Sequence, residues 1–178
     1  MVFVIVNSAL AADTFIVDPE HTFVSFSYKH FNYSIQTSRF DNVTGVILFD
    51  KENNTGNIRI SIDTKSISTG SVIFNKRIQE DDFFATDRFP IATFESDDIV
   101  FNNEDITSVQ GKLTIKDITK PISIMVTNFS CSRNLLTLKY TCGANATAKL
   151  NRSDFDMEKY VPFVGNEMAI TIAIEASR

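Results

Sequence analysis

The sequence predicts an all-β fold: an eight-stranded antiparallel barrel with a short helical insertion around residues 74–88. Residues 111–126 show the pattern most clearly, because Leu113 and Ile115 alternate with polar residues, a polar break ends at Pro121, and alternation resumes at Ile122. Alternation with a period of two marks strands with one apolar face, and the break predicts a hairpin. No sustained helical pattern could cover a sheet, so the sheet must close on itself or pack against a second one.

Eight segments carry strand patterning, and one segment does not. The predicted strands are residues 14–30, 39–50, 57–64, 90–101, 106–116, 119–131, 136–150 and 166–175. Within residues 74–88, Phe74, Ile78 and Phe84 are near helical spacing, which predicts one or two short helices before Pro90. Eight strands closed into a barrel leave an interior that side chains fill or that holds one slim ligand.

The first residues resemble an export signal. Residues 1–12 combine a short apolar run with small residues, which predicts a signal peptide cleaved near Ala11 or Ala12 and a periplasmic domain over residues 13–178. The usual positive start is missing, so the alternatives are a mis-assigned or truncated start and an apolar N-terminus without a targeting role. The run is shorter than the roughly 20 apolar residues that span a bilayer, so we expect a soluble product without stable membrane insertion.

Charge and aromatic content narrow the class of partner. The chain has 178 residues, 17 basic and 22 acidic, for a net charge of −5, and it contains no basic run. Binding to nucleic acid or to an anionic membrane surface is therefore not expected. Sixteen Phe and no Trp indicate either a Phe-rich core or a Phe-lined cavity for an apolar ligand.

Two cysteines lie close together in the sequence. Cys131 and Cys142 are separated by a segment with a plausible turn at Arg133 and Asn134. An exported chain meets an oxidising compartment, where such a pair forms a disulfide; two free buried thiols are the alternative. Neither belongs to a CxxC motif and no His lies nearby, so no metal site is expected.

No catalytic or metal-binding constellation is visible. His21 and His30 are nine residues apart and would point to opposite faces of a straight strand, so they cannot chelate together. The chain lacks a serine nucleophile elbow, an HExxH helix and a phosphate loop. Arg152 is expected to be a structural ion pair or cap. No enzyme activity and no cofactor are predicted.

The order and spacing of many short segments resemble a known family. From about residue 15 to residue 177 the chain is similar to the YceI-like, polyisoprenoid-binding family, whose fold is an extended lipocalin-like barrel. The matching pieces, in order, are Asp18-Pro19-Glu20-His21-Thr22, then Val24, Phe26, Tyr28 and His30, Arg39-Phe40, Gly45-Val46-Ile47-Leu48-Phe49-Asp50, Ile62-Asp63, Ser66-Ile67-Ser68-Thr69-Gly70, Asp82-Phe83-Phe84, Phe89-Pro90-Ile91-Ala92-Thr93-Phe94-Glu95-Ser96, Gly111-Lys112-Leu113-Thr114-Ile115, Thr119-Lys120-Pro121 and Asn151-Arg152-Ser153-Asp154-Phe155. The chain departs from the family pattern at Ser38, at residues 74–78, at Asp156 and in its cysteine pair.

The resemblance implies that the barrel binds a long isoprenoid-like lipid, such as a polyprenyl chain or a quinone tail. The wall should come from one parity of each strand, and the candidate ligand-binding residues are Val24, Phe26, Tyr28, His30, Phe40 and Phe94. His30 shares parity with Tyr28 and is the candidate contact for a polar head group. The alternative is that these side chains fill a solid core.

Two other functions stay open. One is an enzyme or redox accessory protein that acts on a quinone-like or small amphipathic ligand, with His30 or Tyr28 as the acid–base group. The other is an interaction module that uses the acidic helical segment. A homodimer is also left open by the sequence.

Overall fold

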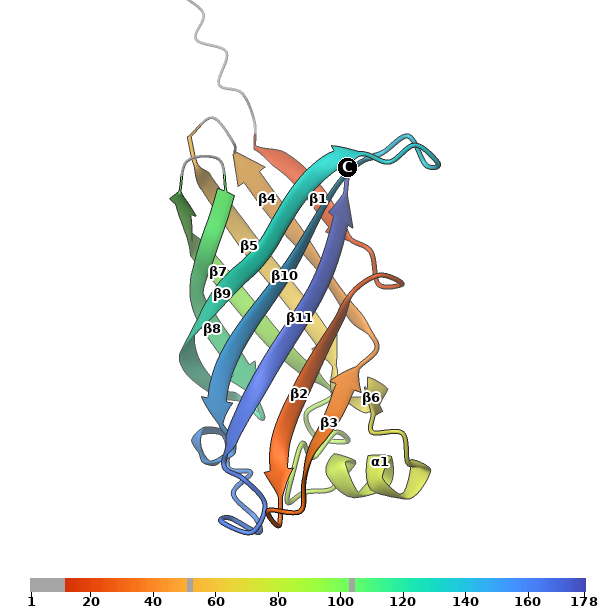
Figure 1. Cartoon of the computed structure of the whole chain (residues 1–178), viewed down its shortest axis with the longest axis vertical. Coiled ribbons are helices and arrows are strands. Elements are labelled where there is room, and N and C mark those ends of the chain that lie inside the picture. The colour runs from red at the N-terminus through yellow and green to blue at the C-terminus, as the bar shows by residue number, and fades with distance from the viewer. Residues whose placement is uncertain (1–11, 51–52, 103–104) are drawn as a thin grey trace, which may run out of the picture.

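The computed structural model describes residues 12–50, 53–102 and 105–178, and within them one antiparallel sheet rolls into a closed barrel (Figure 1). The strands are β1 (Asp13–Val17), β2 (Phe23–His30), β3 (Ser34–Phe40), β4 (Val43–Asp50), β5 (Thr55–Asp63), β6 (Ile67–Ser68), β7 (Ile91–Asn102), β8 (Asp105–Ile115), β9 (Ile118–Arg133), β10 (Tyr140–Asn151) and β11 (Glu167–Ser177). The helices are α1 (Val72–Gln79) and two 3-10 turns, η1 (Thr64–Ser66) and η2 (Arg152–Phe155).

Closure comes from the pairing of the first and last strands. The order β1-β4-β5-β7-β8-β9-β10-β11 forms a ring of eight, because β1 pairs again with β11, and β2, β3 and β6 continue the sheet beyond β11. The predicted eight-stranded antiparallel barrel is therefore confirmed. A closed sheet leaves no long unpaired edge, so its backbone groups are satisfied around the whole ring.

The first two predicted strands are each interrupted. Residues 14–30 divide into β1 and β2 at a turn where the Asp18 carboxylate accepts a hydrogen bond from the Glu20 amide (3.0 Å) and Pro19 has no N–H to donate. Both halves still pair with β11, at Ala176 and at Ala173 respectively. The predicted strand 39–50 divides into the end of β3 and the whole of β4. β3 begins at Ser34, and the sequence did not reveal this earlier start because the first half of the strand is exposed and has no buried apolar face.

Two other boundaries differ from the sequence expectation. β10 begins at Tyr140, so the predicted strand start at Leu136 is wrong: that residue lies in the connection that follows β9. The expected helix is present but short. Ser71 caps α1 by accepting a hydrogen bond from the Phe74 amide (3.4 Å), and the chain continues through turns to Pro90.

One face of every barrel strand points to the interior. β4 shows how the structure resolves an apolar run that has no visible parity: Ile47 and Phe49 line the interior, whereas Val46 and Leu48 are 39% and 38% exposed. We name the two ends of the barrel upper and lower, as they lie in Figure 1. The upper end carries the β9–β10 connection, and the lower end carries α1.

A glycine allows the largest interior side chain of β7 to lie flat. A Cβ atom on Gly111 of β8 would be 2.5 Å from two ring atoms of Phe94 and 2.6 Å from the Glu95 carbonyl oxygen. The ring of Phe94 therefore packs directly over the bare backbone of the neighbouring strand.

A disulfide joins the upper parts of β9 and β10. Cys131 and Cys142 lie directly opposite each other in the ladder and are bonded, and the Cys142 side chain belongs to the interior wall. The bond closes the hairpin that ends in residues 134–139.

We expect Gly111→Ala to lower the free energy of unfolding by about 1–3 kcal/mol, because the new methyl group displaces Phe94. Gly143→Ala is the matched control: its added Cβ has no neighbour closer than 3.6 Å, so a change within about 0.5 kcal/mol is expected. Urea unfolding measures both, and equal stabilities of the two variants would contradict the packing described.

Removing the disulfide should destabilise the barrel without opening it. With a sequence separation of 11 residues, the chain-entropy model gives a loss of about 3 kcal/mol. The measurement is urea unfolding of the unmodified protein with and without reductant, compared with a Cys131→Ala/Cys142→Ala variant. That variant should be insensitive to reductant, and an unmodified protein equally insensitive would show that the bond contributes nothing.

Candidate functional site

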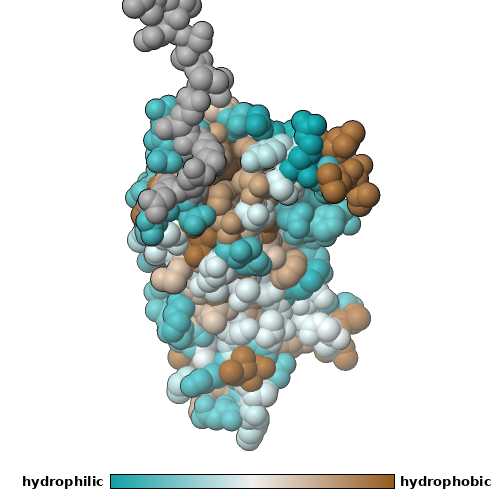
Figure 2. All heavy atoms as spheres, turned by 45° about the horizontal axis from the view of Figure 1, so that its top comes forward, coloured by the Kyte–Doolittle hydropathy of each residue, from teal (hydrophilic) through white to brown (hydrophobic). Residues whose placement is uncertain are grey.

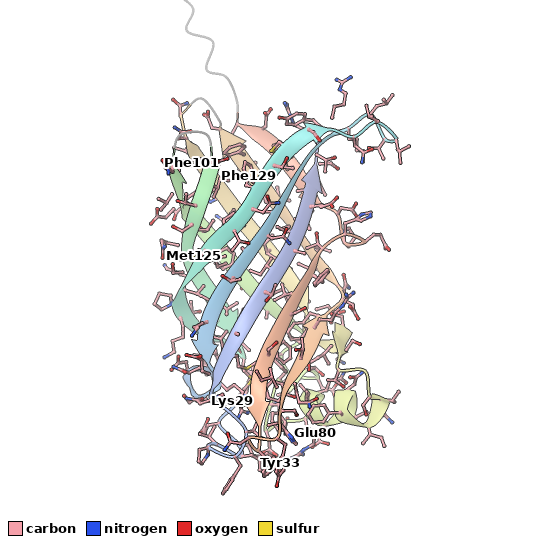
Figure 3. All side chains as sticks on the ribbon, in the orientation of Figure 1. Lys29, Tyr33, Glu80, Phe101, Met125 and Phe129 are labelled. Atoms are coloured by element: carbon pink, nitrogen blue, oxygen red, sulfur yellow. A yellow bond between two sulfur atoms is a disulfide. The ribbon has the colours of Figure 1, made fainter. Side chains whose placement is uncertain are left out.

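The barrel contains an apolar cavity. Its volume is about 210 Å³, and its wall takes side chains from every strand of the ring. Small residues on β10 (Ala144, Ala146 and Ala148) leave room that larger side chains would fill. Aromatic rings gather at the upper end, where Figure 3 labels Phe101 and Phe129. Phe49 stacks on Phe101 (5.9 Å between centroids) and meets Phe129 (6.3 Å).

Three phenylalanine rings form a floor at the lower end of this cavity. Phe26 of β2 lies 5.5 Å from Phe40 of β3 and 6.0 Å from Phe84, and Phe40 lies 5.2 Å from Phe84 in an edge-on contact. Phe84 comes from the connection after α1, so the helical insertion supplies the side chain that closes the barrel. Aromatic pairs at these distances add to the stability already gained from burial.

A second cavity of about 200 Å³ lies below the floor. It is enclosed by β2, α1 and the connection between η2 and β11, and it includes Tyr28 and His30 in its wall. The two cavities share four wall residues: Phe26, Phe84, Met157 and Met168. The partition between them is therefore a single layer of flexible or rotatable side chains.

The Tyr28 hydroxyl is the unpaired polar group of the second cavity. The residue is 7% exposed, and among the described residues its hydroxyl makes no hydrogen bond of normal geometry. The Ser38 hydroxyl is also unpaired, and it lies near enough to Tyr28 to lower the pKa of Tyr28 against the larger effect of burial. Burial raises the pKa of Tyr28, so the phenol stays protonated at neutral pH. A buried hydroxyl without a partner is costly, so it is free to donate to an acceptor that a ligand would bring in.

Arg152 holds the wall of this cavity in place. It is 5% exposed, and its five N–H groups donate to the carbonyl oxygens of Gly165 (2.9 Å), Met157 (2.7 Å), Val164 (3.0 Å) and Lys159 (3.3 and 3.4 Å). Burial lowers the pKa of Arg152, but a guanidinium remains charged in proteins. Because every donor is used, Arg152 positions the connection and has none left for a head group.

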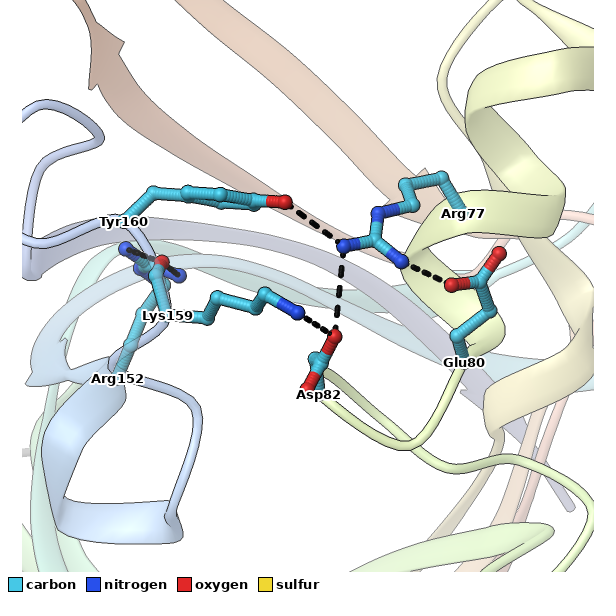
Figure 4. A network of polar contacts seen from close by, with 6 residues as sticks. All are labelled: Arg77, Glu80, Asp82, Arg152, Lys159 and Tyr160. Atoms are coloured by element: carbon cyan, nitrogen blue, oxygen red, sulfur yellow. Dashed lines mark hydrogen bonds and ion pairs between the residues drawn. The ribbon is translucent and has the colours of Figure 1, made fainter.

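A polar network ties the two lower connections together at the rim (Figure 4). Arg77 of α1 donates to the Tyr160 hydroxyl (2.9 Å) and to Asp82 (3.4 Å), and it also pairs with Glu80. Lys159 pairs with Asp82, and this hydrogen bond lowers the pKa of the Asp82 carboxyl. The carboxylate is thus ionised at neutral pH and bridges α1 to the connection before β11.

All six predicted ligand-binding residues lie on cavity walls. Val24, Phe40 and Phe94 line the barrel cavity, Tyr28 and His30 line the second cavity, and Phe26 lines both. Their contact with a ligand stays a prediction. Sequence reasoning missed Met157 and Met168: Met168 shares parity with Ile170 and Ile172 on β11 and was accessible to the same argument, whereas Met157 lies outside any strand.

Over residues 12–50, 53–102 and 105–178, no group of three or more His, Cys, Asp or Glu side chains is placed to hold a metal ion. Within the same residues, no helix has the length and apolar character needed to cross a membrane.

Comparisons with known proteins agree with this geometry. A UPF0312 protein of Pseudomonas paraeruginosa is 29% identical over 175 residues, which cover 97% of this chain and 90% of that protein, and Protein YceI of Escherichia coli is 28% identical over 172 residues, covering 95% and 88%. The crystal structure of Burkholderia cenocepacia BcnA has the same fold, with a TM-score of 0.76 at 24% identity over 89% of this chain and 98% of that one.

A second solved structure, a polyisoprenoid binding domain from Saccharophagus degradans, has a TM-score of 0.69 at 15% identity over 92% of this chain and 97% of that one. The family model described as a YceI-like domain matches residues 15–176, which is nearly the whole described barrel. This chain therefore belongs to the YceI-like family.

Proposed function

We propose that this protein is an exported carrier that binds one isoprenoid-like lipid chain in the barrel cavity and does not transform it. The observation that carries the proposal is a cavity inside the barrel whose wall is apolar from its upper part to the floor of Phe26, Phe40 and Phe84. Each CH₂ group removed from water contributes about 0.8 kcal/mol, so a sheathed chain binds well without a charged contact.

Family membership supports an apolar ligand. The structural neighbour from Saccharophagus degradans is itself described as a polyisoprenoid binding domain, and it has the same fold as this chain. The ring of strands, the inward parity and the cavity are features of this chain's own residues, and they suit a thin chain better than a compact ligand.

The second cavity suits the polar end of such a lipid. The Tyr28 hydroxyl offers a hydrogen bond to an oxygen atom, and His30 lies on the same wall. Arg152 has no donor left, so the end group that fits is neutral, such as an alcohol or a quinone carbonyl. To reach Tyr28, a chain in the barrel has to displace the partition that Phe84 and Met157 form.

Export to the periplasm is part of the proposal. The apolar start of the chain, with small residues at positions 9, 11 and 12, and the Cys131–Cys142 disulfide both favour an oxidising compartment. Residues 1–11 lie outside the described residues. Cell fractionation with a C-terminal epitope, combined with mass determination of the mature N-terminus, tests this part.

The direct test of the carrier role is extraction of the purified protein followed by mass spectrometry. We expect an apolar lipid recovered chemically unchanged after incubation. A ligand recovered in a transformed state, with the change abolished by His30→Ala or Tyr28→Phe, would instead identify an enzyme.

A large side chain placed in the barrel cavity should weaken lipid binding. Ala146 is 5% exposed and lines the cavity, so Ala146→Phe is expected to weaken binding of a long-chain polyprenol by at least about tenfold. Ala169→Phe adds the same ring on the outer face of β11 and should bind normally. Ala148→Leu, a smaller addition to the same wall, serves if the first variant unfolds, with circular dichroism as the check. Undiminished binding by folded lumen variants would contradict the proposal.

Removing the Tyr28 hydroxyl should change ligand affinity without lowering the free energy of unfolding. In Tyr28→Phe, the free energy of unfolding of the ligand-free protein should stay unchanged or rise by up to about 1 kcal/mol, because no hydrogen bond is lost. Affinity for a polyprenol or quinone should fall about five- to tenfold, while affinity for an isoprenoid hydrocarbon without oxygen should not change. An equal loss for both ligands would place the polar end elsewhere.

A further inference from the structure

We propose that the connection between β9 and β10 docks the upper end of the barrel onto the surface of an anionic phospholipid bilayer. This connection, residues 134–139, presents Leu135, Leu136 and Leu138, which are 87%, 94% and 67% exposed; we call these three side chains the leucine tip. Figure 1 shows the hairpin extending beyond the barrel, and Figure 2 shows apolar side chains standing out at the edge of that end.

The exposure of the leucine tip is fixed by its own hydrogen bonds. The Asn134 side-chain oxygen accepts from the amides of Leu136 (2.9 Å) and Thr137 (3.1 Å), and the Asn134 backbone bonds to Leu138 and Lys139 (2.8 Å each). Leu138 has φ +62°, a left-handed conformation that is unfavourable for a leucine. The Cys131–Cys142 bond ties the two arms below it. The chain thus holds three leucines in water in a defined turn.

The charges around the leucine tip suit phospholipid head groups. Arg133 and Lys139 flank it on both sides, and within the described part of the chain neither makes an ion pair. Arg178, from the residue after β11, lies over the ring of Tyr140 (5.2 Å) and pairs with Asp13 (2.5 Å). A short apolar group bordered by cations inserts into the interface while the cations meet phosphate. Although the sequence contains no basic run, the fold gathers basic residues here.

The leucine tip is continuous with the wall of the barrel cavity. Tyr140, at the end of the connection, meets the ring of Phe15 (6.3 Å), which is 3% exposed and lines the cavity, and Cys142 follows on the same wall. Docking through the tip therefore brings the upper end of the cavity to the bilayer. If the barrel carries a lipid chain, as proposed above, the chain passes between bilayer and cavity with little exposure to water. This last step rests on the proposed function, whereas the docking does not.

The lower end of the barrel is a weaker match for the same surface. Val72 and Ile73 on α1 are 73% and 84% exposed, and the lower end also exposes Tyr33, Ile35 and Phe163. The acidic residues 80–82 that follow α1 make ion pairs with Arg77, Arg88 and Lys159. These cations are held by carboxylates and are less available to phosphate head groups than the unpaired Arg133 and Lys139. Val72 and Ile73 thus offer a comparison with the leucine tip, because they lie beside paired charges, whereas Arg133 and Lys139 make no ion pair among the described residues.

The experiment is co-sedimentation of the purified protein with vesicles of phosphatidylcholine, prepared with and without phosphatidylglycerol. We expect binding to the mixed vesicles that weakens as salt rises. Leu135→Ser/Leu136→Ser should reduce the affinity about tenfold or more, and Arg133→Gln/Lys139→Gln should reduce it about tenfold at low salt. Val72→Ser/Ile73→Ser is the matched control and should bind like the unmodified protein. All six positions are exposed, so folding should be unaffected.

Three results would overturn the docking proposal. The unmodified protein could fail to bind mixed vesicles, or the α1 pair could lose binding as much as the leucine pair. In the third, light scattering without vesicles would show a dimer that the leucine variant breaks while vesicle binding persists, which would make the tip a self-association surface. Lipid extraction from the leucine variant separates the two proposals. Loss of vesicle binding in this variant supports docking whether or not the protein yields a lipid, and the recovered lipid tests the carrier role alone.

Discussion

Closure of the sheet between β1 and β11 is the constraint on which the rest of the structure depends. Once the ring is closed, the inner face of every strand converges on one axis, and the inward residues have to fill that space or leave it open. Here the inward residues of β10 are small, and Gly111 lets Phe94 lie flat against the wall. The ring is therefore wider than its own side chains require, and the remaining space is lined by carbon.

The two ends of the barrel differ in the residues that close them, so the two ends of the cavity are not equivalent. At the lower end, Phe84 closes the floor, Arg152 fixes the connection beneath it through backbone carbonyls, and the Arg77–Asp82–Lys159 contacts join the pieces. The unpaired hydroxyl of Tyr28 lies behind this floor. At the upper end, aromatic rings and a disulfide form the wall up to the hairpin. A hydroxyl below and an apolar wall above fit the lipid with one oxygen-bearing end that we propose as the ligand.

Much of the fold was predictable because period-two alternation depends on a face being buried, and a barrel buries one face of every strand. The pattern failed where that condition fails. The first half of β3 is exposed and polar, and Leu136 was assigned to a strand although it lies in an exposed turn. Parity also placed the six candidate residues on cavity walls, yet it could not show that two cavities exist, because Phe84 and Met157 reach the partition from connections.

The polar chemistry of the site was less predictable for a physical reason. Arg152 was expected to find a carboxylate or a cap, but its partners are the carbonyl oxygens of four residues, which every residue possesses and no side-chain pattern reveals. The clustering of Arg133, Lys139 and Arg178 likewise depends on where β11 ends in space. The central claim, that an apolar chain occupies the axis of the closed barrel, is tested most directly by a crystal structure of the purified protein. We predict continuous elongated density beside Phe94 and Ala146 with its polar end near Tyr28, whereas ordered water or repacked side chains along the whole axis would contradict the account.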